Sequence, residues 1–441
     1  MPDRYTQSRA LTTQSAQHIA GGVVSLNRKT DPPIVFVRGA GSKIYDADGH
    51  EYIDYHAAFA PHILGHNHPE VNNAVVQALR QDWSLTGSGT TLWEMRFAEL
   101  LHVAVPSLER IQLTNSGSEA TAHAIRLSRA WTGRDDIIVT LGGYNGWHND
   151  VARAVMPTLE AVGPRVSPGE YRFVPMSAGI PDEVQQRIHV VNFNDAAAVE
   201  DVLQRYPTAC VITEPALQNI GVVPPLPGYL ASLRELCDRY GALLVFDEVK
   251  TGFRAALGGY QRIAQVTPDL STFGKAVANG YPLGVIGGRK DVMDLFDDPD
   301  PARRVLIAGT YNGHPLTVAA AIATLEILMR DDGAVFRQLE ARAARLQSGL
   351  ADIFGELGVQ TLVSRIGSAF CVYFGDHVPT DWHDLMASHD FAFDRRYRRA
   401  LIDGGIYHFP LPCKQGSISA AHTEDDIART LEITRAVLRE L

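Results

Sequence analysis

The sequence is poor in cysteine. Its 441 residues include only four cysteines, at Cys210, Cys237, Cys371 and Cys413, and these are far apart along the chain. No two of them form a Cys-x-x-Cys pair, so their spacing supports neither a disulfide framework nor a structural zinc site. We therefore expect a protein of a reducing compartment that binds no metal and whose thiols are small buried apolar side chains.

Long apolar runs and an excess of basic charge are also missing. No run of about 18 apolar residues could cross a membrane, and the first seventeen residues lack the apolar core of a signal peptide. The chain has 50 acidic and 40 Lys or Arg residues, a formal net charge of −10, whereas general nucleic-acid binders are usually basic. We expect a cytoplasmic protein with neither a membrane nor a nucleic-acid partner.

The composition is that of a folded protein that is too long for one small core. Hydrophobic residues make up 45% of the chain and charged residues 20%. Between about 109 and 290, short apolar runs alternate with amphipathic patterns. Helices are expected at 118–131, 196–205 and 229–240. This alternation predicts an α/β fold with a mostly parallel sheet covered by helices, and in such sheets ligands bind beyond the carboxyl ends of the strands.

The pattern changes on both sides of this region. Apolar alternation around Asp46-Ala47-Asp48-Gly49 predicts a hairpin. After Pro315 we expect two long helices, at about 315–330 and 332–354, then a strand pair around 360–374, and a last helix capped by Thr423. Three units are predicted: an N-terminal segment and hairpin (1–60), a large domain (61–315) and a smaller α+β C-terminal domain (316–441).

A glycine- and serine-rich turn, Asn115-Ser116-Gly117-Ser118-Glu119-Ala120, follows an expected strand and opens a helix. Glycine allows the backbone to approach an anion, hydroxyl groups donate hydrogen bonds, and a helix start offers free N–H groups. Ser116, Gly117 and Ser118 therefore form a candidate phosphate cradle, with an ordinary helix cap as the alternative.

An acid and a lysine end two further expected strands. Asp247 follows an apolar run, where it could cap a helix, join an ion pair or keep the ring nitrogen of a pyridoxal-phosphate (PLP) cofactor protonated. Lys275 has small and apolar neighbours, unlike most surface lysines. Burial would lower its pKa, which makes its amine a candidate Schiff-base nucleophile and proton shuttle.

A fourth segment, 309–315, is polar and precedes a helix, so Thr310 could bind a phosphate or belong to a plain cap. The order of phosphate loop, Asp, Lys and Thr is more specific than any one segment. From about residue 20 to its end, the chain resembles the class III aminotransferases of PLP fold type I. Within that family it is most similar to the glutamate-1-semialdehyde aminomutase branch and its amino-acid transaminase relatives.

The resemblance implies a cofactor, pyridoxal 5′-phosphate, and a role for each matching residue. Lys275, Asp247 and Tyr144 would be catalytic, with Tyr144 stacked on the cofactor ring. The implied cofactor-binding residues are Ser116, Gly117, Ser118, Tyr144, Glu214, Asn219, Asp247, Val249, Lys275 and Thr310. Because Thr310 matches a residue that reaches the phosphate of a neighbouring subunit, the resemblance also implies a homodimer with shared active sites.

The resemblance also suggests where substrate binds. The segment 21–28 is similar to an aminomutase segment, which implies Ser25 and Arg28 as substrate-binding residues, and the planar fork of arginine suits a carboxylate. A solvated Arg28-Lys29 pair is the alternative. Trp147 is similar to the residue at the matching position of transaminase relatives that accept bulky substrates. Lys414 stands where the aminomutases carry an acid near the substrate.

Three departures favour a transaminase over a mutase: Lys414, Asn145 in place of the usual His, and a stretch at 157–170 unlike the aminomutase gating loop. A mutase must retain its diamino intermediate, so it needs that lid. We predict a transaminase that moves an amino group between an amino acid, such as a β- or unusual α-amino acid, and a 2-oxo acid. Glutamate-1-semialdehyde 2,1-aminomutase is the main alternative, and a non-catalytic PLP-binding regulator is a remote one.

Two basic features have no role in this hypothesis. Lys250 could face either the substrate or a subunit interface, and the sequence does not decide between them. The run 395–399 (RRYRR) predicts a solvated helix face.

Overall fold

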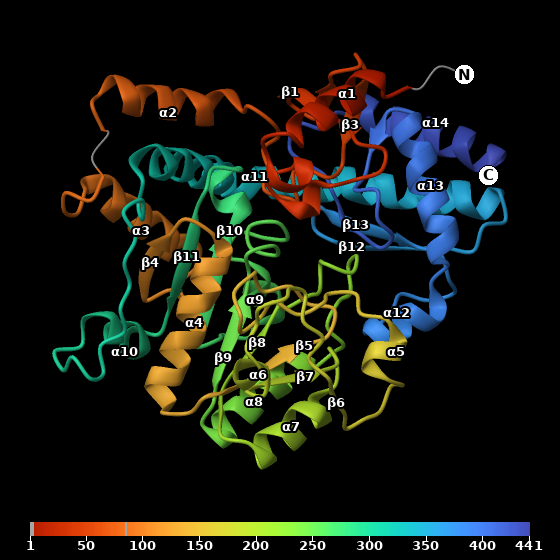
Figure 1. Cartoon of the computed structure of the whole chain (residues 1–441). Coiled ribbons are helices and arrows are strands. Elements are labelled where there is room, and N and C mark those ends of the chain that lie inside the picture. The colour runs from red at the N-terminus through yellow and green to blue at the C-terminus, as the bar shows by residue number, and fades with distance from the viewer. Residues whose placement is uncertain (1–3, 84–85) are drawn as a thin grey trace.

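The computed structural model describes residues 4–83 and 86–441 (Figure 1). Residues 1–3 and 84–85 fall within the first and second predicted units and lie outside the described residues. The strands form an eight-stranded sheet, a four-stranded sheet and a three-stranded sheet. No helix in the described ranges is long and apolar enough to cross a membrane.

The eight-stranded sheet is built from the region between 109 and 290, where short apolar runs alternate with amphipathic patterns. Its order is β4-β11-β10-β9-β8-β5-β7-β6. The five central strands from β10 to β7 are parallel, whereas β11 is antiparallel to both of its neighbours and β6 is an antiparallel edge strand. The bounds are β4 Arg110–Thr114, β5 Asp136–Thr140, β6 Glu170–Tyr171, β7 Ile188–Val191, β8 Thr208–Thr213, β9 Leu243–Asp247, β10 Leu270–Gly274 and β11 Gly284–Gly288.

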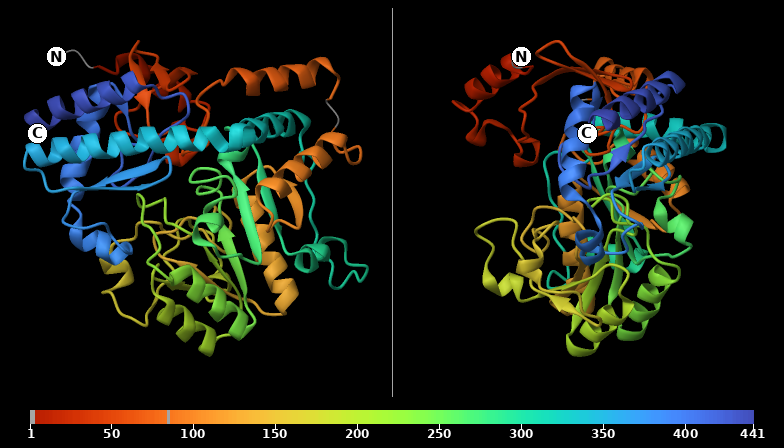
Figure 2. Two further views of the ribbon diagram at one scale, coloured as in Figure 1. Left: turned by 180° about the vertical axis from the view of Figure 1, so that it is seen from behind. Right: turned by 90° about the vertical axis from the view of Figure 1, so that its right-hand side faces the viewer.

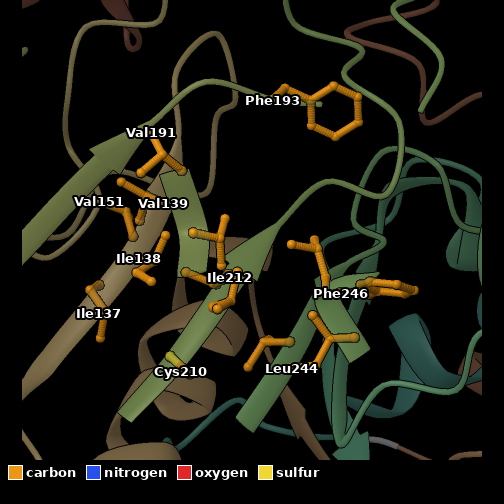
Figure 3. Packing of buried hydrophobic residues seen from close by; sticks show 14 of the residues in the cluster. Ile137, Ile138, Val139, Val151, Val191, Phe193, Cys210, Ile212, Leu244 and Phe246 are labelled. Carbon is orange, nitrogen blue, oxygen red and sulfur yellow. The ribbon is translucent and has the colours of Figure 1, made fainter. Parts of the chain in front are cut away.

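The main core lies around the parallel strands. β5, β7, β8 and β9 are buried along their whole length, which is the pattern of a sheet covered on both faces. Figure 3 shows side chains such as Ile138, Ile212 and Phe246 packed in this core. The packed helices include α4 Gly117–Thr132, α7 Ala196–Arg205 and α8 Tyr229–Tyr240.

The N-terminal segment joins the C-terminal part of the chain. β2 (Lys43–Asp46) and β3 (Glu51–Asp54) form the expected hairpin, β1 (Phe36–Ala40) extends it, and the late strand β14 (Ile406–Tyr407) pairs with β3. Helix α1 and the last helix, α14 (Glu424–Glu440), lie on the same side of the molecule (Figure 1). The helices before the large sheet are α1 Thr6–Ser15, η1 Ala20–Gly22, η2 Leu26–Arg28, α2 Pro69–Arg80 and α3 Leu92–Ala104.

One long element, α11 (Pro315–Glu356), crosses the molecule between the large sheet and the two chain ends (Figures 1 and 2). It is interrupted at Arg330–Gly333, where three consecutive residues have positive φ angles. The interruption agrees with the expectation of two helices there. α11 packs on α2 and α3 at one end of the molecule and on α14 (Glu424–Glu440) and β12 (Leu362–Ile366) at the other.

The C-terminal part combines a small sheet with helices. β12, β13 and β15 form the sheet, and Thr423 caps α14 as expected, since its hydroxyl accepts the N–H of Asp426. The remaining bounds are α5 Leu159–Val162, α6 Asp182–Gln185, α9 Tyr260–Ala264, η3 Lys275–Ala278, α10 Lys290–Met293, η4 Asp294–Asp297, β13 Ala369–Tyr373, α12 Trp382–Ser388, α13 Phe391–Asp403 and β15 Gly416–Ser417.

The expectation of a solvated helix face at 395–399 is wrong for two of its residues. Tyr397 and Arg398 lie on the buried face of α13. Arg398 donates from Nε to the carboxylate of Asp394 at 2.6 Å, one helical turn earlier. The ion pair satisfies a guanidinium that the run of arginines had suggested was in water.

Candidate active site

A cavity of about 260 Å³ lies at the carboxyl ends of the strands of the large sheet. Its lining comes mostly from loops that directly follow β4, β5, β8, β9 and β10. The lining includes Pro61, Asn115, Gly117, Ser118, Tyr144, Asn145, Glu214, Asn219, Asp247, Val249, Lys250, Lys275 and Tyr281. Segments far apart in sequence therefore meet at one sheet edge, as expected for a parallel sheet.

Lys275 lines the cavity from the position just after β10. Its φ angle is +46°, in the left-handed region that a lysine seldom occupies, so the surrounding structure holds its backbone in place. Burial lowers the pKa of its amine, and the nearby carboxylates of Asp247 and Glu214 only partly oppose this shift. A lowered pKa increases the share of the amine that is neutral and nucleophilic.

Asp247 ends β9 with its carboxylate almost fully buried, at 3% exposure. One oxygen accepts the N–H of Val249 at 3.1 Å and the hydroxyl of Thr272 at 3.0 Å, and the other accepts the amide of Asn145 at 2.8 Å. Burial raises its pKa, and these hydrogen bonds oppose the rise. Within the described residues, no Lys, Arg or His makes an ion pair with this carboxylate. It is therefore suited to face a cation held in the cavity.

The start of α4 forms one wall of the cavity. A Cβ atom on Gly117 would lie 2.7 Å from Cγ1 of Val249, so only glycine fits this close approach. Ser118 lines the cavity, whereas the side chain of Ser116 lies outside the lining and accepts the N–H of Glu119 as a helix cap. The free N–H groups of the first turn remain suited to an anion.

Glu214 organises the wall beside Tyr144. Its carboxylate accepts the backbone N–H of Tyr144 at 3.0 Å, the side-chain amide of Asn219 at 2.9 Å and the backbone N–H of Gln218 at 3.0 Å. Burial raises the pKa of Glu214, and the charge of Lys250 opposes that rise. These contacts fix three of the predicted site residues relative to one another.

Two lysines bind the backbone of this wall. Lys250 donates to the carbonyl oxygen of Gln218 at 2.5 Å, and Lys414 donates to the carbonyl oxygen of Asn219 at 2.7 Å. Lys250 lines the cavity, so the structure places it at the site. Lys414 lies behind the wall, and burial lowers its pKa to about 8.

Six predicted site residues do not line the cavity, namely Ser25, Arg28, Ser116, Trp147, Thr310 and Lys414. Arg28 is exposed in η2 and Ser25 precedes that helix, while Thr310 is exposed in the loop before α11. Trp147 is 67% exposed. The roles predicted for these residues stay predictions. Conversely, the sequence predicted no site role for Asn145 and left that of Lys250 open, although they directly follow Tyr144 and Val249.

Among the described residues, one group of side chains lies close enough to hold a metal ion, namely His389, Asp394 and Cys413, all buried. Its carboxylate is already shared by Arg398 and His389, at 2.6 and 3.0 Å. A guanidinium at this position repels a metal cation, so the group carries no metal-site proposal.

The fold and the cavity at the strand ends are those of a PLP-dependent enzyme. Residues 25–388 match the family Aminotransferase class-III. Over 442 residues the chain is 40% identical to glutamate-1-semialdehyde 2,1-aminomutase from Desulforapulum autotrophicum, with 99% of both chains covered. The chain therefore belongs to the class III aminotransferase family.

Solved structures agree with this assignment. An omega-transaminase from Sphaerobacter thermophilus is similar with a TM-score of 0.92 and 30% identity over 99% of both chains. A β-phenylalanine aminotransferase from Variovorax paradoxus has a TM-score of 0.83 and 29% identity, over 99% of this chain and 95% of that chain. The predicted α/β fold of PLP fold type I is confirmed, as is the prediction of a PLP-dependent enzyme.

The cavity fits the cofactor of this family. The carboxylate of Asp247, which is buried and has no cationic partner in the described ranges, matches a ring nitrogen. The amine of Lys275, held just after its strand, matches an aldehyde. The start of α4, where Gly117 leaves no room for a Cβ atom, matches a phosphate. When bound, the cofactor ring withdraws electrons from the substrate carbon that carries the amino group.

Proposed function

We propose that the chain is a transaminase that exchanges an amino group between an amino acid, such as a β-amino acid, and a 2-oxo acid. In this proposal Lys275 binds the cofactor and moves protons, Asp247 holds the ring nitrogen in its charged form, and Tyr144 stacks on the ring. Gly117 and Ser118 bind the phosphate. The remaining predicted contacts of Glu214, Asn219 and Val249 are part of the same proposal.

The observation that carries the choice of transaminase is the anchoring of residues 157–170. The carbonyl of Pro157 accepts the indole N–H of Trp382 at 3.2 Å, and Arg165 donates to Asp381 at 2.8 Å. Trp382 and Asp381 are buried. A mutase retains its diamino intermediate behind a lid, and a segment fastened to the C-terminal part by buried partners is poorly suited to open and close.

Lys414 supports the same choice. A diamino intermediate would bring an additional ammonium group towards this wall, where like charges repel. A 2-oxo acid is an anion and has no such conflict. A charged lysine behind this wall therefore disfavours an intermediate that carries a second ammonium group.

The 1,2-aminomutase remains a second candidate because the relative with 40% identity over nearly the whole chain carries that name. One assay separates the two. We expect stoichiometric transfer of the amino group when an amino donor and a 2-oxo acid are supplied together, with β- and α-amino acids compared as donors. Isomerisation of glutamate 1-semialdehyde without a co-substrate, and no transfer to any 2-oxo acid, would establish the mutase instead.

We also propose a homodimer in which Thr310 serves the site of the partner chain. Several large apolar side chains are exposed on the described surface, among them Leu92, Val103, Trp147, Leu306 and Tyr311, at 62–70% exposure. The loop that carries Thr310 lies against α3, since a Cβ on Gly313 would be 3.0 Å from Glu94. A second copy would cover such apolar surface. A location in the cytoplasm stays a prediction.

A further inference from the structure

A chain of buried polar side chains reaches Asp247 from the loop after β5. Arg153 donates from Nη2 to Oδ1 of Asn145 at 3.1 Å, and Asn145 donates from Nδ2 to Oδ2 of Asp247 at 2.8 Å. Arg153 and Asn145 are each 2% exposed and Asp247 is 3% exposed. Bulk water therefore does not compete for these hydrogen bonds, which act in surroundings of low polarity.

Arg153 is an isolated buried cation. Its guanidinium donates to the carbonyl oxygens of Thr140 at 2.6 Å and Val151 at 3.4 Å, and in the described part of the chain it has no carboxylate within ion-pair distance. Burial lowers its pKa to about 10, so it remains charged at neutral pH, and the carboxylates that attract it are Glu214 and Asp247. A buried charge is costly, which calls for a reason beyond packing.

The arginine also determines how the amide of Asn145 is oriented. An amide has one accepting and one donating end, and only the donating end can bind an ionised carboxylate. Because Arg153 can only donate, it holds the oxygen of Asn145 towards itself and turns the NH₂ group towards Asp247. The other oxygen of Asp247 is held independently by Val249 and Thr272.

We propose that Arg153 is a positioning residue, which acts through Asn145 to fix the carboxylate of Asp247 and to hold it ionised against the cofactor ring nitrogen. Arg153 does not line the cavity, so it acts through another residue. The assignment concerns cofactor binding, so it holds for a transaminase and for a mutase alike.

A double-mutant cycle tests the proposal on the dissociation constant of PLP from the refolded or dialysed full-length apoprotein. Arg153→Met should weaken PLP binding roughly tenfold, because one charge-assisted contribution to Asp247 is lost. In the Asp247→Asn background the same substitution should change affinity by less than about threefold, since the carboxylate it serves is gone. Arg153→Lys should recover part of the affinity because it keeps the charge.

Arg134→Met is the matched control. Arg134 likewise donates to backbone carbonyls, those of Thr208, Tyr240 and Gly241, and it does not line the cavity. Its loss should leave PLP affinity unchanged. If Arg153→Met binds PLP as tightly as the wild type, or if its effect is equally large in the Asp247→Asn background, Arg153 has only a packing role and the proposal is overturned.

A second variant keeps the test open if Arg153→Met does not fold. Asn145→Ala removes the middle of the chain and leaves the bonds of Arg153 to Thr140 and Val151 in place. We expect it to weaken PLP binding by a similar factor and to alter the visible absorbance of bound PLP, with the melting temperature measured in parallel. An unchanged affinity for PLP and an unchanged spectrum would contradict the proposal that Arg153 acts on Asp247 through Asn145.

Discussion

Lys275 differs from an ordinary lysine in its backbone as well as in its burial. Its φ angle is positive, and its side chain lines the cavity just after the end of β10. A strained backbone at a buried amine is the kind of feature that concentrates at functional sites. The lysine is therefore the residue at which the proposed function is tested most directly.

Lys275→Ala is expected to abolish turnover, because Lys250, the other lysine that lines the cavity, is bonded to the carbonyl of Gln218, while the phosphate cradle and Asp247 still bind PLP. The loss should exceed about a thousandfold. Turnover and the visible absorbance of the purified variant measure the two effects separately. Lys290→Ala is the control, since Lys290 is exposed in a surface pair with Asp294. A normal rate in Lys275→Ala would refute the assignment.

Lys414 makes stability depend on pH. Burial lowers its pKa from 10.5 to about 8, so between these values the unfolded chain binds more protons than the folded one and stability rises with pH. Below about pH 8 the charged lysine carries the full desolvation cost. The free energy of unfolding of Lys414→Met, relative to that of the wild type, should therefore be higher at pH 7 than at pH 10.5. We expect this pH-dependent difference to be about 2 kcal/mol, a value reduced for the partial exposure of Lys414.

Chemical unfolding of both proteins at the two pH values measures this difference. The lost hydrogen bond to the carbonyl of Asn219 is stronger for the charged amine at pH 7, so its loss offsets part of the stabilisation expected there. A difference in unfolding free energy that does not change with pH would mean that Lys414 is well solvated.

At the residue scale, the sequence indicated groups that follow strands but not the groups that support them. Asp247 and Lys275 could be found because apolar runs end at each of them. Asn145 was noticed only as a departure from the family, and Arg153 carries no local signal: it bonds to Asn145 through a loop whose path depends on tertiary packing. The burial of Arg398 was missed although its partner, Asp394, lies only one helical turn earlier, because the run of arginines alone does not show which face of the helix is covered.

At the scale of elements, the start of α4 is limited by space. Gly117 has no positive φ angle, and its requirement for glycine comes instead from Val249, whose two methyl groups would lie 2.7 and 2.8 Å from a Cβ. Val249 follows β9, so the helix start and a strand end are in direct contact. A Cβ atom added at position 117 must therefore displace either the start of α4 or the segment after β9.

Gly117→Ala is expected to destabilise the fold by about 1–3 kcal/mol and to weaken PLP binding, because overpacking shifts the first turn of α4. Adding Val249→Ala should restore much of the lost stability. Gly355→Ala is the matched control: it lies in α11 with no atom within 4 Å of the added Cβ, so it should be neutral or stabilising by up to about 1 kcal/mol. Thermal unfolding and PLP titration of the variants check these effects. Wild-type affinity in Gly117→Ala would show that the contact is not tight.

Elements with strong periodicity could be predicted closely. The bounds of α7 and α8 equal the expected ranges, and α4 differs by one residue at each end. The edge strand β6 was missed because two residues carry no alternation. The interruption of α11 could be placed because two aspartates and a glycine, Asp331, Asp332 and Gly333, favour left-handed backbone.

At the scale of the whole molecule, the order of the strands in the large sheet could not be predicted from the sequence. Alternation of strands and helices indicates a parallel sheet, but the antiparallel strand β11 between β4 and β10 is specified only by long-range packing. The division at 60 and 315 stays a prediction. The pairing of β14 with β3 shows that the first unit shares a sheet with the last.

Mixed dimers test the proposal that two chains share each site. A chain with Lys275→Ala and a chain with Thr310→Glu, each weakly active or inactive alone, should regain about a quarter of wild-type activity when unfolded and refolded together. Half of the dimers would then hold one site with an intact Lys275 and an intact Thr310. Activity after mixing and mass by light scattering are the measurements. A monomer, or no recovery in mixed dimers, would contradict the shared site.

The interruption of α11 at Arg330–Gly333 has a consequence for engineering. The two halves of the element are joined by four residues of irregular backbone, so the register of one helix does not dictate that of the other. A crossover with a relative placed at this turn would exchange the chain beyond it without recutting a continuous helix. Chimeras joined there should retain the loops that line the cavity while inheriting the C-terminal part of the donor, including the position of Lys414 behind the wall.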